Sequence, residues 1–144
     1  PPALIRVVDA SVAAKWVVAE PGSEAAWRVL AAKGPLIAPD LLVAEVGNVL
    51  WKKAGRGLVG SDQAREALVW LPELFDRLFD AAALAPRAIE IAIAHAEPLS
   101  DCLYVALAEL AGPDCRLVTA DRGVRELALQ AGLQAARVEL VPAG

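Results

Sequence analysis

A short apolar run rich in β-branched residues, Leu4-Ile5-Arg6-Val7-Val8, lies near the start of the chain and ends at Asp9. Its length and composition predict a buried strand. A helical stretch follows at once over residues 11–18, and Pro21-Gly22 closes it. A strand that leads directly into a helix is typical of proteins with parallel sheets.

The same alternation of strand and helix continues along the chain. Residues 61–80 are expected to form one helix, bent at Pro72, and Asp40 is expected to cap the long helix that follows it. No internal repeat or linker is present, so we expect a single α/β domain over residues 1–144, a three-layer α/β/α sandwich with a mainly parallel central sheet. The predicted strands are 4–8, 36–38, 82–84, 116–119 and 137–141, and the helices are 11–18, 23–32, 40–54, 61–80, 87–96, 100–111 and 124–131.

The helix predicted over 61–80 carries an apolar stripe from Leu71 to Phe79. Its helical spacing is explained most simply by the hydrophobic core. Alternatively, the helical hairpin around residues 45–80 forms a groove for a protein partner, with Trp51 and Trp70 as anchors.

Composition excludes several classes of protein. With 57% hydrophobic and 22% charged residues, the chain is neither disordered nor of low complexity. The formal net charge of −4 argues against binding nucleic acid through bulk positive charge. We expect no membrane span and no secretory leader. Cys102 and Cys115 fit neither a zinc site nor a disulfide framework, and we expect two buried thiols in a reducing cytoplasm.

Four acids stand out by their position. Asp9 and Asp121 each follow a predicted strand, and ligands of parallel sheets bind at the carboxyl ends of the strands. Glu45 and Asp101 lie in helices that are otherwise apolar. Each acid alone can be explained as a helix cap, a first-turn acid or a solvated side chain. Together they predict a site at one edge of the sheet.

Four carboxylates without a basic partner repel one another, and a divalent cation removes that conflict. Oxygen ligands select hard ions, Mg²⁺ or Mn²⁺, which can activate a water and stabilise charge on a phosphoryl group. Other chemistries have less support. The lone His95 is expected to be a partly exposed surface residue, and no P-loop or dinucleotide-binding glycine motif is present.

Four segments of the chain, in this order, resemble the PIN domain, and in particular the VapC ribonuclease toxins of bacterial and archaeal toxin–antitoxin pairs. The resemblance covers essentially the whole chain. The sequence departs from the family where Ser100 and Cys102 flank Asp101, since an aromatic residue and an alanine are common there. The segments are Val7-Val8-Asp9-Ala10-Ser11 with Lys15-Trp16, Ala44-Glu45-Val46-Gly47-Asn48-Val49-Leu50-Trp51-Lys52, Ser100-Asp101-Cys102-Leu103-Tyr104-Val105-Ala106-Leu107-Ala108-Glu109, and Val118-Thr119-Ala120-Asp121-Arg122.

The resemblance implies a Mg²⁺- or Mn²⁺-dependent endoribonuclease. It implies that the family's metal-binding and catalytic acids are Asp9, Glu45 and Asp101, with Asp121 as a fourth, more variable one. Family members are usually homodimers, and a cognate VapB-like antitoxin blocks the site with its C-terminal segment. Polar positions beside the metal correspond to Ser11, Asn48 and Thr119.

An RNA substrate also needs cationic contacts. Lys15, Lys52 and Arg122 lie close in sequence or along a helix to the proposed acids, and we expect them to contact phosphates. Lys53 and Arg56 are interpreted as ordinary surface charges. Two other functions stay open: a catalytically silent PIN-like module that binds RNA or protein, and another Mg²⁺-dependent phosphoryl-transfer enzyme.

Overall fold

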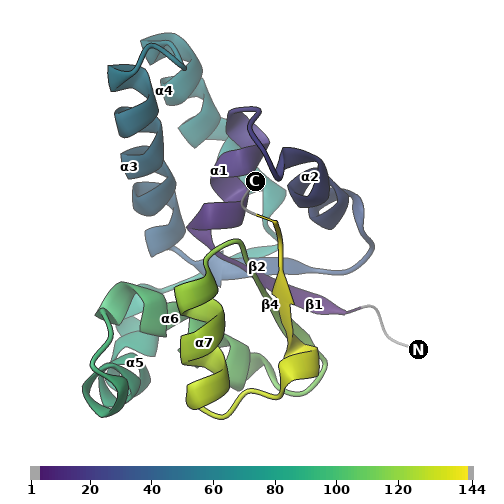
Figure 1. The fold of residues 1–144 in the computed structure, drawn as a ribbon, viewed down its shortest axis with the longest axis vertical. Coiled ribbons are helices and arrows are strands. Elements are labelled where there is room, and N and C mark those ends of the chain that lie inside the picture. Colours follow the sequence, from purple (N-terminus) through teal and green to yellow (C-terminus); the bar gives the residue numbers. More distant parts are fainter. Residues whose placement is uncertain (1–3, 143–144) are drawn as a thin grey trace.

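The computed structural model describes residues 4–142, and these form an α/β domain around one five-stranded sheet (Figure 1). The strand order is β3-β2-β1-β4-β5, and every neighbouring pair is parallel. The prediction of an α/β fold with a mainly parallel sheet is therefore confirmed. The strands are β1 (Ile5–Val8), β2 (Leu36–Pro39), β3 (Arg77–Phe79), β4 (Cys115–Thr119) and β5 (Val138–Leu140).

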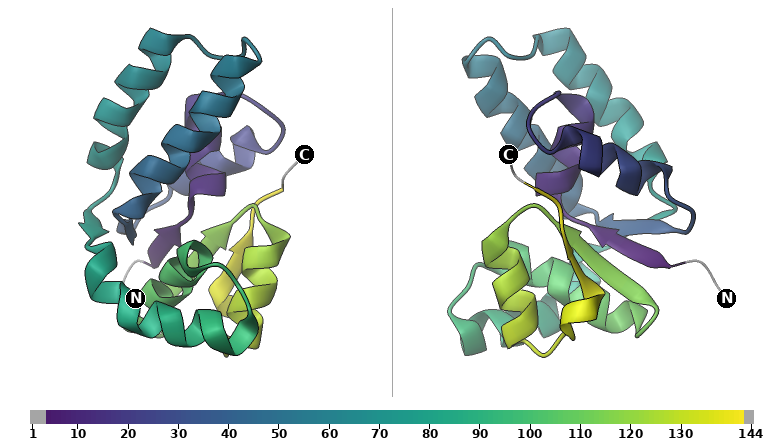
Figure 2. Two further views of the ribbon diagram at one scale, coloured as in Figure 1. Left: turned by 90° about the vertical axis from the view of Figure 1, so that its left-hand side faces the viewer. Right: turned by 45° about the vertical axis from the view of Figure 1, so that its right-hand side comes forward.

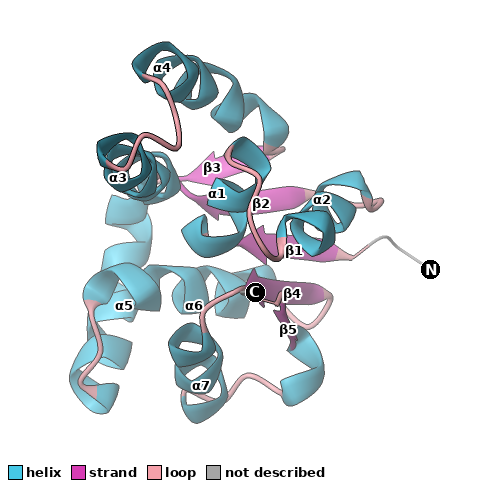
Figure 3. Cartoon of the chain, turned by 45° about the horizontal axis from the view of Figure 1, so that its top comes forward, coloured by secondary structure: helices cyan, strands magenta, loops and turns pink. Residues whose placement is uncertain are grey.

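The helices cover both faces of the sheet (Figure 3). α5, α6 and α7 lie on one face, and α1 and α2 lie on the other. α3 and α4 form a hairpin that contacts α1 and extends away from α5, α6 and α7 (Figure 2). The helices are α1 (Ala10–Val17), α2 (Ser23–Ala31), α3 (Leu41–Gly55), α4 (Ser61–Trp70), α5 (Ala81–His95), α6 (Leu99–Ala111) and α7 (Arg122–Gln130), with 3₁₀ turns η1 (Leu71–Leu74) and η2 (Ala135–Arg137).

The core lies between the central strands and α6. Val7 and Val8 of β1 are fully buried, and seven consecutive residues of α6, from Cys102 to Ala108, are buried as well. A helix that is apolar all round must be covered on all sides, and α6 contacts β1, β2 and β4 on one side and α5 and α7 on the others. Both cysteines are free and buried, as expected from their spacing.

The segment from residue 61 to residue 84 differs from the prediction. The helix ends at Trp70, and Pro72 lies in the 3₁₀ turn η1, because proline has no N–H to continue the helical ladder. The third strand is β3, residues 77–79, whereas the predicted strand at 82–84 lies within α5. Alanine favours helix, and the Asp80 side chain caps α5 by accepting a hydrogen bond from the Ala82 N–H.

The apolar stripe from Leu71 to Phe79 belongs mainly to the core, although it is not one helix face. Leu71 and Phe75 are buried, and Leu74, Leu78 and Phe79 are partly buried against the core cluster.

Asp40 occupies the residue before α3, as predicted, but its side chain does not cap that helix. Its Oδ1 accepts a hydrogen bond from the Ala81 N–H at 3.1 Å instead. This carboxylate therefore links the end of β2 to the start of α5.

Within residues 4–142, no single helix is long and apolar enough to cross a membrane. α5 and α6 are long and apolar enough only when they are taken together, and the two helices are bent by 117° relative to each other.

Arg137 fastens the last strand to the core. Its guanidinium donates hydrogen bonds to the carbonyl oxygens of Ala108 and Gly112, both at 2.7 Å, and to that of Cys115 at 3.0 Å. These carbonyls lie at the end of α6 and the start of β4, where a helix leaves backbone acceptors without partners.

Replacing Arg137 with glutamine is expected to lower the free energy of unfolding by about 2–3 kcal/mol, because buried carbonyls lose charged donors. Urea denaturation measures this loss. Arg65→Gln, at an exposed position of α4, is the charge-matched control and is expected to change stability by less than about 0.5 kcal/mol. Equal effects of the two substitutions would show that Arg137 does not fasten this part of the fold.

Candidate active site

The four predicted acids lie around one pocket at the carboxyl edge of the sheet. β1 and β4 are neighbours there, with Val8 paired to Val118, so Asp9 and Asp121 leave the sheet side by side. Asp9 precedes α1, Asp121 precedes α7, Asp101 lies in the first turn of α6, and Glu45 is near the start of α3. The pocket has a volume of about 190 Å³ and is lined by Asp9, Ala10, Ser11, Glu45, Val49, Asp101, Tyr104, Asp121 and Val124.

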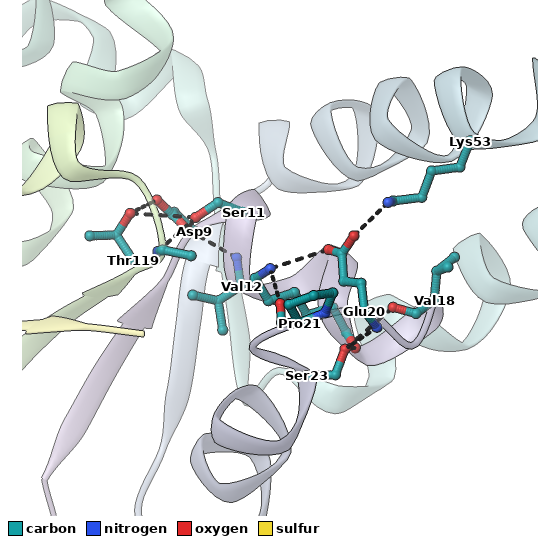
Figure 4. A network of polar contacts seen from close by, with 11 residues as sticks. Asp9, Ser11, Val12, Val18, Glu20, Pro21, Ser23, Lys53 and Thr119 are labelled. Carbon is teal, nitrogen blue, oxygen red and sulfur yellow. Dashed lines mark hydrogen bonds and ion pairs between the residues drawn. The ribbon is translucent and has the colours of Figure 1, made fainter. Parts of the chain in front are cut away.

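Asp9 is the most buried of these acids, with only 4% of its surface exposed. Its Oδ1 accepts hydrogen bonds from the Ser11 hydroxyl (2.5 Å) and the Val12 N–H (3.3 Å), and its Oδ2 accepts one from the Thr119 hydroxyl (Figure 4). Ser11 is itself held by the Ala120 N–H, which donates to its oxygen at 2.9 Å. Ser11 and Thr119 therefore fix the Asp9 carboxylate.

Burial raises the pKa of Asp9 from 3.8 to about 6. The hydrogen bonds from Ser11, Thr119 and Val12 lower that pKa, but they only partly offset the cost of burying the charge, and the charge of Asp121 adds to it. The ionised carboxylate is thus an unfavourable group in the folded protein without a cation.

Asp101 is half-buried in the pocket, and no hydrogen bond within residues 4–142 engages its carboxylate. Its pKa is raised by burial and then by the nearby charges of Asp121, Glu45 and Glu97. Asp121 is exposed and caps α7, since its Oδ1 accepts from the Gly123 N–H at 2.7 Å and the Val124 N–H at 3.4 Å.

Glu45 has a partner that the sequence analysis missed. The buried Tyr104 donates its hydroxyl to Glu45 Oε1 at 2.6 Å. Burial, together with the charge of Glu45, raises the pKa of Tyr104, so the phenol stays protonated and remains a donor. The signal was available: Tyr104 follows Asp101 by three residues, which places both on one face of α6. Asn48, by contrast, is exposed on α3 and does not line the pocket.

The donor set fits a hard divalent cation in its chemistry. The pocket is lined by four carboxylates and no lysine or arginine, and burial and mutual repulsion raise the pKa of both Asp9 and Asp101. In the described part of the chain, no three acidic, histidine or cysteine side chains are close enough to bind one ion directly. His95 is partly exposed on α5, as predicted, and does not line the pocket.

The predicted RNA contacts lie in different environments. Lys15 is buried, donates to the Pro21 carbonyl at 2.9 Å and forms an ion pair with Glu20 at 3.3 Å. Arg122 is exposed and lines a second groove beside the acid pocket. Lys52 is exposed on α3 and lines neither cavity, whereas Lys53 lines the groove. That Lys15, Lys52 and Arg122 contact RNA stays a prediction.

Comparison with known proteins identifies the family of this chain. The sequence model of the PIN-domain family matches residues 6–129. The chain belongs to the PIN-domain family. Ribonuclease VapC3 of Pyrobaculum aerophilum is 40% identical to it over 122 residues, which are 83% of this chain and 92% of that protein. Ribonuclease VapC1 of Mycobacterium tuberculosis is 35% identical over 117 residues, 80% of this chain and 84% of that protein.

Solved structures of PIN-like fold show the same architecture at lower sequence identity. PAE2754 from Pyrobaculum aerophilum superposes with a TM-score of 0.68 at 22% identity, over 92% of both chains. VapC20 of Mycobacterium tuberculosis, a toxin that cleaves the sarcin–ricin loop, superposes with a TM-score of 0.71 at 20% identity, over 92% of this chain and 98% of that one. The chain is thus a homologue of the VapC ribonucleases with a PIN fold.

The raised pKa of Asp9 makes stability depend on pH in the absence of metal. The folded pKa of about 6 exceeds the ordinary 3.8, so the folded protein binds this proton more tightly than the unfolded chain does. The free energy of unfolding therefore falls as pH rises through that window, and stays lower above it. Asp9→Asn removes the charge, and we expect it to stabilise the protein at pH 7 by about 1–3 kcal/mol in EDTA.

Urea denaturation at several pH values measures this difference, which is expected to shrink as pH falls from about 6 towards about 4. Asp114→Asn, at an exposed acid before β4, is the control. A constant difference between wild type and Asp9→Asn at all pH values would contradict the buried-charge account.

Proposed function

We propose that this PIN-domain protein is a Mg²⁺- or Mn²⁺-dependent endoribonuclease and the toxin of a toxin–antitoxin pair. The observation that carries the proposal is the pocket that is lined by Asp9, Glu45, Asp101 and Asp121 and by no lysine or arginine. The match of the chain to ribonucleases of the VapC type supports RNA as the substrate.

The pocket contains acids that would bind the cation, and hydroxyl groups orient two of those acids. Asp9, Glu45, Asp101 and Asp121 would hold the cation, at most two of them as direct ligands and the others through its bound waters. When bound, the cation supplies an activated water and stabilises charge on the phosphodiester. Ser11 and Thr119 orient Asp9, and Tyr104 orients Glu45. Asp101 is the carboxylate with no competing donor among the described residues, so it is the acid most free to act as a ligand or to accept a proton.

RNA would enter along the groove beside this pocket. Arg122 is exposed on that groove and is proposed as a phosphate contact. Lys52 is proposed to meet RNA that extends beyond the groove along α3. Lys15 is proposed to act on phosphates through its charge, since its ammonium is already bound to Glu20 and Pro21.

Protein partners would use the apolar surfaces outside the site. Trp51 is 72% exposed and Val69 is 67% exposed on the α3–α4 hairpin, and Trp70 is also exposed. Exposed aromatic residues of this kind are typical anchors of interfaces. We propose that these surfaces serve a cognate VapB-like antitoxin and a homodimer contact. A reducing, cytoplasmic location is proposed because Cys102 and Cys115 are free and buried.

Neutralising Asp101 is the direct test of the function. Asp101→Asn keeps the side-chain volume but removes a charged ligand, and we expect Mn²⁺-dependent cleavage of RNA to fall by at least about 100-fold. The assay follows a labelled RNA on a denaturing gel, with and without EDTA, which is expected to stop the wild type.

Asp114→Asn is the matched control, because it removes an equal charge at the opposite end of β4. It is expected to leave the rate unchanged. RNA cleavage that survives Asp101→Asn or EDTA would exclude the proposed mechanism.

Tyr104→Phe tests the orientation of Glu45. The variant keeps the ring and loses only the hydrogen bond, so the midpoint of the Mn²⁺ titration is expected to rise about tenfold, while the rate at saturating Mn²⁺ approaches that of the wild type. The Mn²⁺-induced increase in Tm gives a second readout of metal binding. If the titration curves of the two proteins superimpose, Tyr104 has only a structural role.

A further inference from the structure

A groove of about 520 Å³ adjoins the acid pocket. It shares Ser11, Val49 and Asp121 with the pocket, so the two form one continuous cleft at the carboxyl edge of the sheet. Asp9, Glu45 and Asp101 line only the acid pocket, which is the acid end of the cleft. The groove alone is lined by Lys15, Glu20, Lys53 and Arg122, and it forms the cationic end.

Glu20 lies between two lysines at the cationic end. Its Oε2 accepts from Lys53 Nζ at 2.5 Å (Figure 4). Its Oε1 accepts from Lys15 Nζ at 3.3 Å. The side chains of Lys15, Glu20 and Lys53 are only 7%, 25% and 16% exposed. Burial raises the pKa of Glu20, but the hydrogen bond from Lys53 and the charge of Lys15 outweigh it and lower that pKa overall. Lys53 is therefore not the ordinary surface charge that the sequence suggested.

The loop that carries Glu20 is held in place by its own hydrogen bonds. The Glu20 N–H donates to the Ser23 hydroxyl at 2.9 Å, and that hydroxyl donates to the Lys15 carbonyl at 2.9 Å. Lys15 also donates to the Pro21 carbonyl at 2.9 Å. Lys53 extends from α3 to Glu20 on this loop. The ion pair with Glu20 therefore fixes the position of the Lys53 ammonium.

The charges at this end of the cleft do not balance. Glu20 is one carboxylate shared by two ammonium groups, and Arg122 adds a third cation at the start of α7. With Asp121, the groove is lined by three cations and two carboxylates. A surplus of positive charge beside a half-buried acid favours an anion that enters from the groove. Because the groove runs into the acid pocket, a phosphodiester chain can occupy both ends at once.

We propose that Lys53, held at the groove wall by Glu20, binds a phosphate of the RNA adjacent to the one in the acid pocket, and that Glu20 is an internal competitor that weakens this contact. The identity of the anion as RNA rests on the proposed function. The phosphate takes over the hydrogen bond that Lys53 gives to Glu20, while Lys15 keeps Glu20 neutralised.

The test measures binding of a fluorescein-labelled single-stranded RNA by anisotropy, in EDTA so that cleavage is excluded, over a series of salt concentrations. Lys53→Gln is expected to weaken binding about tenfold at low salt and to flatten the slope of log affinity against log salt by about one. Lys53→Arg keeps the charge and is expected to restore binding. Glu20→Gln is expected to tighten binding several-fold, since the competitor loses its charge.

Lys33→Gln is the charge-matched control. This exposed lysine precedes β2, so it lies towards the amino end of that strand, whereas the cleft lies at the carboxyl edge of the sheet. It is expected to change the affinity less than about twofold. Binding by Lys53→Gln that equals wild type, or an RNA affinity too weak to detect in the wild type, would overturn the proposal. Weaker binding by Glu20→Gln would overturn the competitor role.

A parallel cleavage assay with Mn²⁺ separates this proposal from the proposed function. If wild type cleaves RNA and Asp101→Asn does not, the ribonuclease assignment holds even where Lys53→Gln binds RNA normally. If the wild type binds RNA through Lys53 but does not cleave it, the phosphate contact holds and the ribonuclease assignment fails.

Discussion

The buried carboxylate of Asp9 is the constraint on which the site depends. It lies at the end of the central strand β1, almost fully removed from water, and receives hydrogen bonds from Ser11 and Thr119. Thr119 is the last residue of β4, so the carboxylate joins the two central strands at the edge where the acid pocket opens. The other acids are placed around it by the helices that begin at the same edge. Helix N-termini favour negative charge, which helps to hold four acids around one pocket.

The cleft has two ends of opposite charge, and at each end a hydrogen-bond partner fixes one side chain. Tyr104 holds Glu45 at the acid end, and Glu20 holds Lys53 at the cationic end. This separation explains how a chain with a net charge of −4 can serve a nucleic acid. In the proposed function, a cation in the acid pocket would neutralise the excess charge locally, and the lysines beside it would provide the attraction that the protein as a whole lacks.

Much of the fold and of the acid pocket could be predicted from the sequence. The β-branched run before Asp9 and the apolar run around Asp101 gave clear local signals, and the family resemblance brought the four acids together. The segment around β3 could not be predicted. Leu78 and Phe79 share the helical spacing of the apolar residues before them, although Pro72 ends the helix earlier. Whether they form a strand depends on pairing with β2. The roles of Tyr104 and Lys53 depend on contacts between residues 59 and 33 positions apart, which no local pattern encodes.

The proposed function depends on the binding of a divalent cation in the acid pocket. A calorimetric titration of Mn²⁺ into the protein in the absence of RNA tests it most directly, because the result does not depend on substrate or on catalysis. We expect saturable binding that is lost when Asp9 and Asp101 are both replaced by asparagine. Absence of binding to the wild type, or binding that survives the double replacement, would contradict it.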